Sequence, residues 1–372
     1  MNKFLLAISM LAASLTANAQ SNVTIYGVAD ATVEAVSAKG AANGVERGTF
    51  SRVNSTASYI GFKGSEDLGN GLKALFQIET GVATDNNTGF TGGRDTFVGL
   101  SSANAGTVLF GTLTGPTRAA GQLADSRFNV SGVAAGTAVF GKPTGGSGSG
   151  TFDTRFSNAI AYISPTFNGL TATAAYSAGE NKSVSGAAAA DVKNTSGYDL
   201  GLTYKTGPLT TALTHAELRN RLDNSAAGTN LDNSKLTRLV SVYSFNGGHK
   251  VSAMIERSKN EYTGLAGASL ARNAWGLGGK YQLTSSDAIV AQYFQANNPS
   301  GSFYADNSNR KASIYEIGYE HYLSKRTALK TAYTALNNQS SADYDFSTNA
   351  IGGGNGSGVD YKVLSAGIRH AF

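Results

Sequence analysis

The sequence predicts an all-β fold, a transmembrane antiparallel β-barrel of about sixteen strands. Apolar and polar side chains alternate with a period of two along most of the chain. Short and long connections between these segments follow one another in turn. The 372 residues include 46 glycines, no cysteine and only 15% charged residues, against roughly 25% in an ordinary soluble domain. The lack of cysteine excludes a disulfide scaffold, a thiolate zinc site and a cysteine nucleophile.

The alternation is clearest in the segment that follows a Gly-Asn-Gly turn. Leu72, Phe76 and Ile78 share one face, and Lys73 and Glu79 share the other. A strand points successive side chains to opposite faces, so the polar face of each segment needs a wet environment. If the apolar faces meet lipid, the polar faces line a lumen. We expect these side chains to line it: Lys73, Glu79, Arg272, Lys280, Glu316 and Glu320.

The alternating segments number about sixteen, with boundaries uncertain by a few residues. They lie at 22–35, 52–64, 71–83, 94–102, 106–114, 155–164, 169–178, 197–206, 208–219, 235–246, 249–258, 271–283, 286–297, 311–323, 326–336 and 359–372. Short turns alternate with long polar links, the pattern of an outer-membrane barrel with short periplasmic turns and long external loops. About sixteen strands enclose an interior too wide for side chains to fill, so we expect an aqueous lumen.

The link at 115–154 is longer than the others, with about forty residues, and is glycine-rich near its end. Connections of this length in compact proteins are usually functional or disordered. Composition alone leaves two alternatives open. The loop either folds into the lumen and narrows it, or it lies loose outside the barrel.

Residues 1–19 are predicted to be a secretory signal peptide. Lys3 supplies the positive charge, residues 4–15 the apolar stretch, and Ala17-Asn18-Ala19 the small-residue cleavage site. The apolar stretch is too short for a spanning helix, which needs roughly 20 residues. We therefore expect an exported protein whose residues 20–372 form one barrel domain.

Distinctive motifs occur from one end of the chain to the other. Residues 61–74 read Gly-Phe-Lys-Gly-Ser-Glu-Asp-Leu-Gly-Asn-Gly-Leu-Lys-Ala. Further motifs lie at 23–30, 93–100, 162–165, 323–329 and 366–372. Together they resemble the Gram-negative general-diffusion porins of β-proteobacteria, the neisserial and Comamonas-type family. The resemblance covers the whole chain, with gaps at the long loops.

This resemblance implies a water-filled channel for passive diffusion of small hydrophilic solutes and ions. It also implies a homotrimer in outer-membrane lipid and a third external loop folded inward, which favours the lumen alternative for 115–154. Counting back in twos from Phe372 gives a mostly apolar face that ends in an aromatic residue. By the same resemblance, the barrel-assembly machinery recognises this last strand.

Members of the family that prefer anions carry a cluster of wall arginines at the narrowest point. Two of its positions are matched by Arg94 and Arg155. Alternation supports an inward Arg155, because Tyr162 falls on the opposite face, and gives mixed support for Arg94. Two further positions that carry arginine in the family fall on Tyr59 and Thr112. We expect all four residues at the constriction. Arg94, Arg155 and the basic formal charge of the chain predict a preference for anions, which should be weak because two guanidinium groups of the cluster are missing.

The predicted inward loop carries three charges, on Arg118, Asp125 and Arg127. They would add to the charge at the constriction or create a field across it, opposite an acidic lining of Glu79, Glu316 and Glu320. An ordinary solvated charge is an equally open alternative for each loop residue.

Enzymatic and nucleic-acid functions have little support. The four histidines lack metal-ligand spacing, and no Gly-x-Ser-x-Gly motif occurs. The Gly-rich segment 352–356 lacks the Lys-Ser/Thr continuation of a P-loop and is expected to be a flexible external loop. There is no dense basic patch with interleaved aromatics. We expect no catalysis, no cofactor, no metal and no nucleic-acid partner.

Two other functions stay open. The long loops would bind a partner if the protein were a surface receptor or adhesin that the barrel only anchors. A channel selective for one solute class is the closer alternative, because the ring of Tyr59 suits a lining that binds sugars or aromatic acids.

Overall fold

The computed structural model describes residues 23–44, 46–126, 135–142, 152–179, 195–222, 230–262, 267–347, 350–351 and 356–372. The predicted signal peptide and the Gly-rich segment 352–355 lie outside these residues. Most of the described chain is β-strand. Within the described ranges, no helix is long and apolar enough to cross a membrane.

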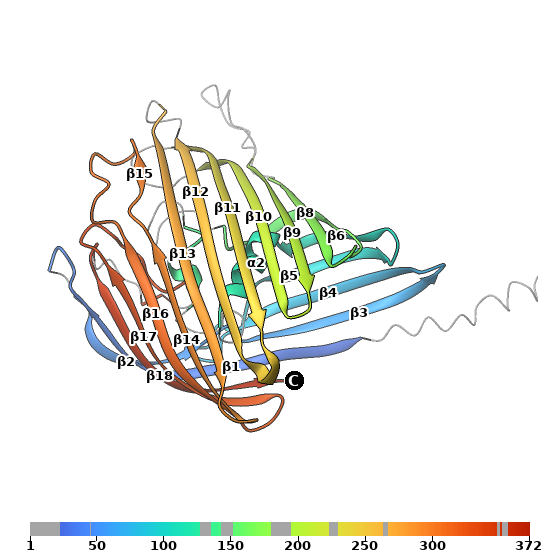
Figure 1. Cartoon of the computed structure of the whole chain (residues 1–372), viewed down its shortest axis with the longest axis horizontal. Coiled ribbons are helices and arrows are strands. Elements are labelled where there is room, and N and C mark those ends of the chain that lie inside the picture. The colour runs from blue at the N-terminus through green and yellow to red at the C-terminus, as the bar shows by residue number, and fades with distance from the viewer. Residues whose placement is uncertain are drawn as a thin grey trace, which may run out of the picture.

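The strands form one antiparallel sheet that closes on itself (Figure 1). Closure occurs where β1 (Thr24–Lys39) pairs with β18 (Asp360–Ala371). The strands between them are β2 (Gly48–Ser55), β3 (Tyr59–Gly69), β4 (Leu72–Val82), β5 (Phe90–Ser102), β6 (Gly106–Thr114), β7 (Arg155–Ile163), β8 (Leu170–Ala178), β9 (Ser196–Thr206), β10 (Leu209–Leu222), β11 (Asn230–Ser244), β12 (Lys250–Tyr262), β13 (Ser269–Gln282), β14 (Asp287–Ala296), β15 (Ser300–Gly301), β16 (Ala312–Tyr322) and β17 (Thr327–Asn338).

Two of the spanning strands are interrupted. Both β2 and β3 pair with β1, and the break between them lies at residues 56–58. Both β14 and β15 pair with β13. Counting each interrupted pair once gives 18 − 2 = 16 spanning strands. The predicted number is confirmed, and each of the sixteen predicted segments overlaps one spanning strand.

The turn between β3 and β4 shows why the short connections form. Asn70 and Gly71 have φ angles of 53° and 75°, both in the left-handed region. Two such residues make the type I′ turn, whose twist matches that of the flanking strands and which favours Asn-Gly. The local sequence therefore specifies a tight hairpin at this end of the barrel.

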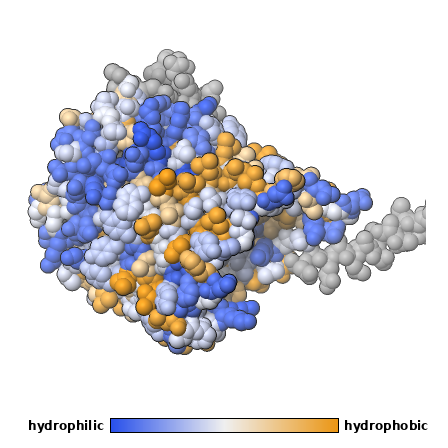
Figure 2. Space-filling view, viewed as in Figure 1, coloured by the Kyte–Doolittle hydropathy of each residue, from blue (hydrophilic) through white to orange (hydrophobic). Residues whose placement is uncertain are grey.

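The outer face of the wall is apolar. On β9, Leu200, Leu202 and Tyr204 are exposed on the outside of the barrel. Asp199 of the same strand faces inward and is buried. Figure 2 shows a band of apolar residues across the strands with hydrophilic residues beyond it. An outer-membrane barrel carries such a band where it meets the hydrocarbon.

The interior holds parts of two long links. A helix, α2 (Pro116–Ala124), and a short 3-10 helix, η2 (Gly136–Ala138), come from the link after β6, and α2 contacts β9 to β13. Residues of the link between β17 and β18 bury their side chains in the same cluster. This inner cluster includes Ala120, Ala124 and Phe140 of the first link, Tyr344, Phe346 and Ile351 of the second, and Val240, Met254 and Phe294 of the wall.

The apolar band predicts that the free-energy cost of placing a charged residue on the outer face depends on its depth in the membrane. We expect Leu200→Arg, near the middle of the outer face of β9, to destabilise the barrel by about 2–4 kcal/mol. Thr206→Arg, at the end of the same strand, should cost only about 0–1 kcal/mol. Urea unfolding of both variants in lipid vesicles measures the difference. Equal costs would show that this face does not meet a hydrocarbon core.

Candidate functional site

Tyr59 and Arg94 meet on the inner face of the wall. Tyr59 begins β3 directly after the break, where Ala57 has a φ of 66° that a non-glycine residue rarely adopts. The rings of Tyr59 and Tyr26 are 6.2 Å apart, edge to face. The guanidinium carbon of Arg94 lies 4.1 Å from the centroid of the Tyr59 ring. One face of that ring is therefore covered by a cation.

Glu79 holds Arg94 in this place. The Nε atom of Arg94 forms an ion pair with Glu79, and the hydroxyl of Tyr26 donates to the same carboxylate at 3.1 Å. A bulge in β5 sets both Arg94 and Asp95 opposite Glu79. Arg94 therefore lies on the inner face, between Glu79 and Tyr59. Glu79 lies beside Arg94 rather than on an opposing acidic wall, so much of the arginine's charge is balanced within the pair.

Arg155 makes the equivalent pair on the next part of the wall. Its Nε atom lies 3.1 Å from Asp95, and its Nη1 atom donates to the carbonyl oxygen of Gly93 at 3.4 Å. The hydroxyl of Thr114 donates to Asp95 at 2.9 Å. Both wall arginines therefore have a carboxylate partner.

The alternation argument for Arg155 does not hold in the structure. The register between β6 and β7 shifts after Gly111, and Asn158 has a φ of 49°. Phe156 is consequently buried on the inner face beside Leu113. A count in twos from Tyr162 thus fails before it reaches Arg155, which joins the site through its ion pair with Asp95 and its position at the end of β7.

Thr112 lies on the outer face, and its predicted place at the constriction is wrong. It pairs with Thr96, which pairs with Ile78, and Ile78 is 54% exposed on the apolar side. Gly111 holds the inward position before it, and Leu113 after it is buried inside. No change at Thr112 alone would place a charge in the lumen.

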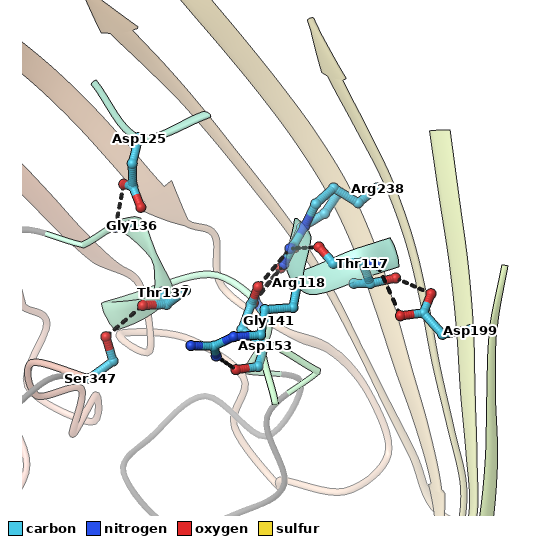
Figure 3. Close-up of polar contacts among 11 residues, drawn as sticks. Thr117, Arg118, Asp125, Gly136, Thr137, Gly141, Asp153, Asp199, Arg238 and Ser347 are labelled. Carbon is cyan, nitrogen blue, oxygen red and sulfur yellow. Dashed lines mark hydrogen bonds and ion pairs between the residues drawn. The ribbon is translucent and has the colours of Figure 1, made fainter. Parts of the chain in front are cut away.

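Arg118 approaches the wall arginines from α2. Its Nη1 atom donates to the carbonyl oxygen of Asp153 (Figure 3). Burial lowers the pKa of Arg118, and the positive charge of Arg155 lowers this pKa further. Among the described residues no carboxylate forms an ion pair with Arg118, so its charge is the least balanced in the group. Arg127 lies outside the described residues.

The start of α2 is fixed by a carboxylate from the wall. Gly115, the residue before the helix, offers no side-chain cap, and Pro116 suits the first helical turn. Asp199 of β9 accepts hydrogen bonds from the backbone N–H of Thr117 at 2.9 Å and from its hydroxyl at 2.7 Å. A negative group at a helix N-terminus pairs free N–H groups and opposes the positive end of the dipole.

Arg238 of β11 ties the loop to the wall more strongly. It is fully buried, and its nitrogens donate to Glu256 at 2.7 and 2.9 Å and to Asp153 at 2.8 Å twice (Figure 3). A further bond of 2.7 Å reaches the carbonyl oxygen of Thr117. A Cβ atom on Gly121 of α2 would lie 2.6 Å from this guanidinium, so the close approach requires glycine.

The end of α2 is held by three wall side chains. The hydroxyl of Ser252 donates to the carbonyl of Ala124 at 2.6 Å, and Lys250 Nζ donates to that of Asp125 at 2.8 Å. Gln292 accepts from the backbone N–H of Ser126 at 3.0 Å. Both ends of the helix are therefore bonded to the inner face.

Asp125 is a buried structural group. Its carboxylate accepts the N–H of Gly136 at 3.0 Å, and burial raises its pKa to about 7. Because the pKa of Asp125 is higher in the folded than in the unfolded protein, its contribution to folding stability is complete below about pH 4 and is lost as the pH rises through 7. Asp125 is buried and bonded within the loop, so it is part of the loop's own structure.

The second inner link packs on the first. Thr137 and Ser347 share a hydrogen bond of 2.5 Å between their hydroxyls (Figure 3), and Lys142 Nζ donates to the carbonyl of Asp345 at 3.3 Å. The ring of Phe140 packs edge to face on that of Phe294 of the wall, with centroids 5.3 Å apart. The two links therefore form one packed body on the β10–β18 side of the interior.

The other predicted lining residues lie on the inner face but differ in exposure. Lys73 is exposed, whereas Glu320 is 1% exposed and bonded to Tyr322 at 2.5 Å and paired with Lys280 at 3.3 Å. Glu316 accepts a hydrogen bond from Thr334 at 3.2 Å. The buried acids are therefore structural partners in the wall.

Phe372 closes the seam. Its backbone exchanges two hydrogen bonds of 3.1 Å with Gly27, and its ring lies against the same glycine, where a Cβ would overlap it. This placement agrees with the outer apolar face predicted from the alternation of β18.

The site contains residues that the sequence did not single out. Arg238 falls on the inner face of β11 between Leu236 and Val240, which signals an unusual buried charge. Its partner Asp153 comes from the loop, so nothing in the local pattern joins the two. Asp199, a lone carboxylate on the inner face of β9, carried the same kind of signal.

A family model described as Gram-negative porin matches residues 5–341. The chain belongs to this family. It is 30% identical to outer membrane porin protein 32 of Delftia acidovorans over the full length of both chains. It is 29% identical to the major outer membrane protein P.IB of Neisseria meningitidis serogroup B, with 88% of this chain and 91% of that protein covered. The solved anion-selective porin from Comamonas acidovorans matches with a TM-score of 0.76 and 27% identity, covering 95% of this chain and 100% of that structure.

These matches confirm the predicted β-proteobacterial porin family and its outer-membrane location. They also confirm the barrel fold. The porin barrel here carries its arginines in two groups. Arg94, which stacks on Tyr59, lies near Arg118 and Arg155, while Arg238 is buried in the anchor of the inner loop.

The anchor predicts a large effect of Arg238→Met in this porin. The change leaves Asp153 and Glu256 buried without their cation, which should cost about 3–5 kcal/mol. Arg219→Met is the control, because Arg219 is 55% exposed and its pair with Glu217 is screened by water and should contribute little to stability. Urea unfolding measures both, and single-channel recordings should show noisier currents only for Arg238→Met. Similar stability losses in the two variants would contradict the anchoring role.

Proposed function

We propose that this porin is a general-diffusion channel with a weak preference for anions. The carrying observation is the group formed by Arg94, Arg155 and Arg118, in which Arg94 stacks on Tyr59 and both Arg94 and Arg155 are ion-paired. Cationic side chains lower the energy of a passing anion. A carboxylate a few ångströms away cancels most of that effect for an ion that passes both charges at a similar distance. Because the carboxylates of Glu79 and Asp95 partly cancel the charges of the arginines, the preference for anions should be weak.

The loop at 115–154 narrows the passage in this proposal. Support comes from α2, which is bonded to the inner wall at both ends and brings Arg118 towards Arg155. The packed second link adds bulk on the same side. The narrowest point would then lie between the loop and the wall segment that carries Tyr59 and Arg94.

The selective-channel alternative has less support from Tyr59. One face of its ring is covered by Arg94, and its edge contacts Tyr26. A sugar or aromatic acid would have to displace the guanidinium to stack there. Charge, rather than stacking, is the more direct role of this group, and no catalytic role is proposed for it.

We also propose that the mature chain is a homotrimer, exported through cleavage after residue 19 and assembled through recognition of the strand that ends at Phe372. An outer groove beside the closure seam, about 780 Å³ in volume, supports a subunit contact there, and its lining includes Ala31, Val33, Leu329 and Ala366. Small and apolar side chains let barrels pack closely in lipid.

Purified protein in a planar bilayer tests the proposed function. We expect linear single-channel currents and a zero-current potential in a salt gradient whose sign shows a modest anion preference. A clear cation preference would overturn the selectivity. Block by a low concentration of one solute would favour a specific channel, and a lack of current would favour the receptor alternative.

Glu79→Gln should strengthen the anion preference, because it leaves Arg94 without its counter-charge. One charge acting at about 4 Å through water is worth about 1 kcal/mol, so the permeability ratio should rise by up to about five-fold. Tyr59→Arg should shift selectivity in the same direction. Glu261→Gln, on the outer face of β12, removes the same charge away from the lumen and is the control. If Glu79→Gln leaves the zero-current potential at the wild-type value, the Arg94–Glu79 pair is not at the narrowest point.

A further inference from the structure

Arg272 is a second buried arginine of the wall, and it lacks what Arg238 has. It lies on the inner face of β13 near the end that carries the long loops, with 4% of its surface exposed. None of its three side-chain nitrogens has a hydrogen-bond partner among the described residues. Arg238, which is also buried, lies two strands away on β11 and donates to two carboxylates and a carbonyl.

The surroundings of Arg272 are rich in donors and cations. Its guanidinium carbon lies 5.3 Å from the ring centroid of Tyr344, whose hydroxyl is also buried without a partner in the described chain. Lys142 Nζ lies 5.9 Å from the same ring. Arg310 lies 3.5 Å from the ring of Tyr304 and donates to the carbonyl oxygens of Asp306 and Ser341 at 3.2 and 3.1 Å.

Carboxylates near Arg272 do not balance it directly. Glu256 is already bonded to Arg238 and to the N–H of Gly141 at 2.8 Å. Asp343 is exposed on the second inner link, and no hydrogen bond or ion pair joins it to Arg272. The region therefore combines an unpaired guanidinium, an unpaired hydroxyl and two further cations.

Such an arrangement is costly when empty. A buried guanidinium without hydrogen bonds loses its hydration and gains little in return. A small oxyanion would provide both the missing charge and the acceptors, because its oxygens match the planar fork of an arginine in a bidentate contact. The hydroxyl of Tyr344 would supply one more donor to the same ligand.

We propose that Arg272 and the hydroxyl of Tyr344 form a binding site for a small oxyanion such as inorganic phosphate or a carboxylate. The site faces the interior, so its ligand is a solute and not a lipid headgroup. It is separate from the constriction group of Arg94 and Arg155, and it does not depend on conduction. The nitrogens are sealed from solvent, so the anion enters when the link that carries Tyr344 moves and then holds this link against β13.

Unfolding in phosphate tests this site. In the folded protein in detergent, at constant ionic strength set with sodium chloride, the urea midpoint of the wild type should rise with the logarithm of the phosphate concentration. Arg272→Met should abolish this dependence. Arg257→Met is the matched control, because Arg257 lies on the adjoining strand β12 with its side chain on the outer face, and it should keep the wild-type dependence.

A gentler variant covers the case in which Arg272→Met does not fold. Tyr344→Phe keeps the ring and removes only the hydroxyl, so the midpoint should still rise with phosphate, but with a binding constant weakened several-fold. A wild-type midpoint that does not respond to phosphate would overturn the proposal, as would an equal response in Arg272→Met or an unchanged binding constant in Tyr344→Phe. Each readout is independent of ion flow, so a failure here leaves the proposed channel function unaffected.

Discussion

The structure depends on one constraint: a backbone that crosses hydrocarbon must pair all of its N–H and C=O groups within the protein. The sheet meets this constraint by closing, with β1 paired to β18 along the length of the seam. Closure also fixes the two faces of each strand, so that Leu200 meets lipid while its neighbour Asp199 meets the interior. The apolar band and the polar inner surface are two consequences of the same hydrogen-bonded wall.

The interior is organised by charge pairing. Arg238 is surrounded by Asp153, Glu256 and a carbonyl, and this buried ion-pair network is one of the bonds that hold the loop against the wall. Arg94 and Arg155, elsewhere on the inner face, are each matched by one carboxylate and retain partial exposure. An arginine–carboxylate pair therefore acts as a rigid anchor where it is fully buried, and it weakens the positive field of the arginine where water reaches the pair.

The strands could be predicted because their signal is local: a period of two is written into consecutive residues. The site could be predicted only in part. The positions of Tyr59, Arg94 and Thr112 were expected from the family resemblance, and the structure turns Thr112 to the outer face. A bulge in β7 breaks the count in twos from Tyr162, so the alternation argument for Arg155 fails. Arg238 and Asp153 are 85 positions apart, so no local pattern could join them. The inward packing of Tyr344 likewise depends on Phe140 and the wall, which no alternation within its own link reveals.

The seam has a consequence for the order of events during biogenesis. Val28 pairs with Ala371, and Phe372 bonds to Gly27, so the partner that completes the first strand of the barrel is its last strand, β18. An open edge of unpaired backbone on β1 therefore persists until β18 has been made and has joined the sheet. During that interval β1 can pair with another molecule as readily as with its own C-terminal strand. A barrel that closes in this way is therefore exposed to strand pairing between molecules until its last strand is in place.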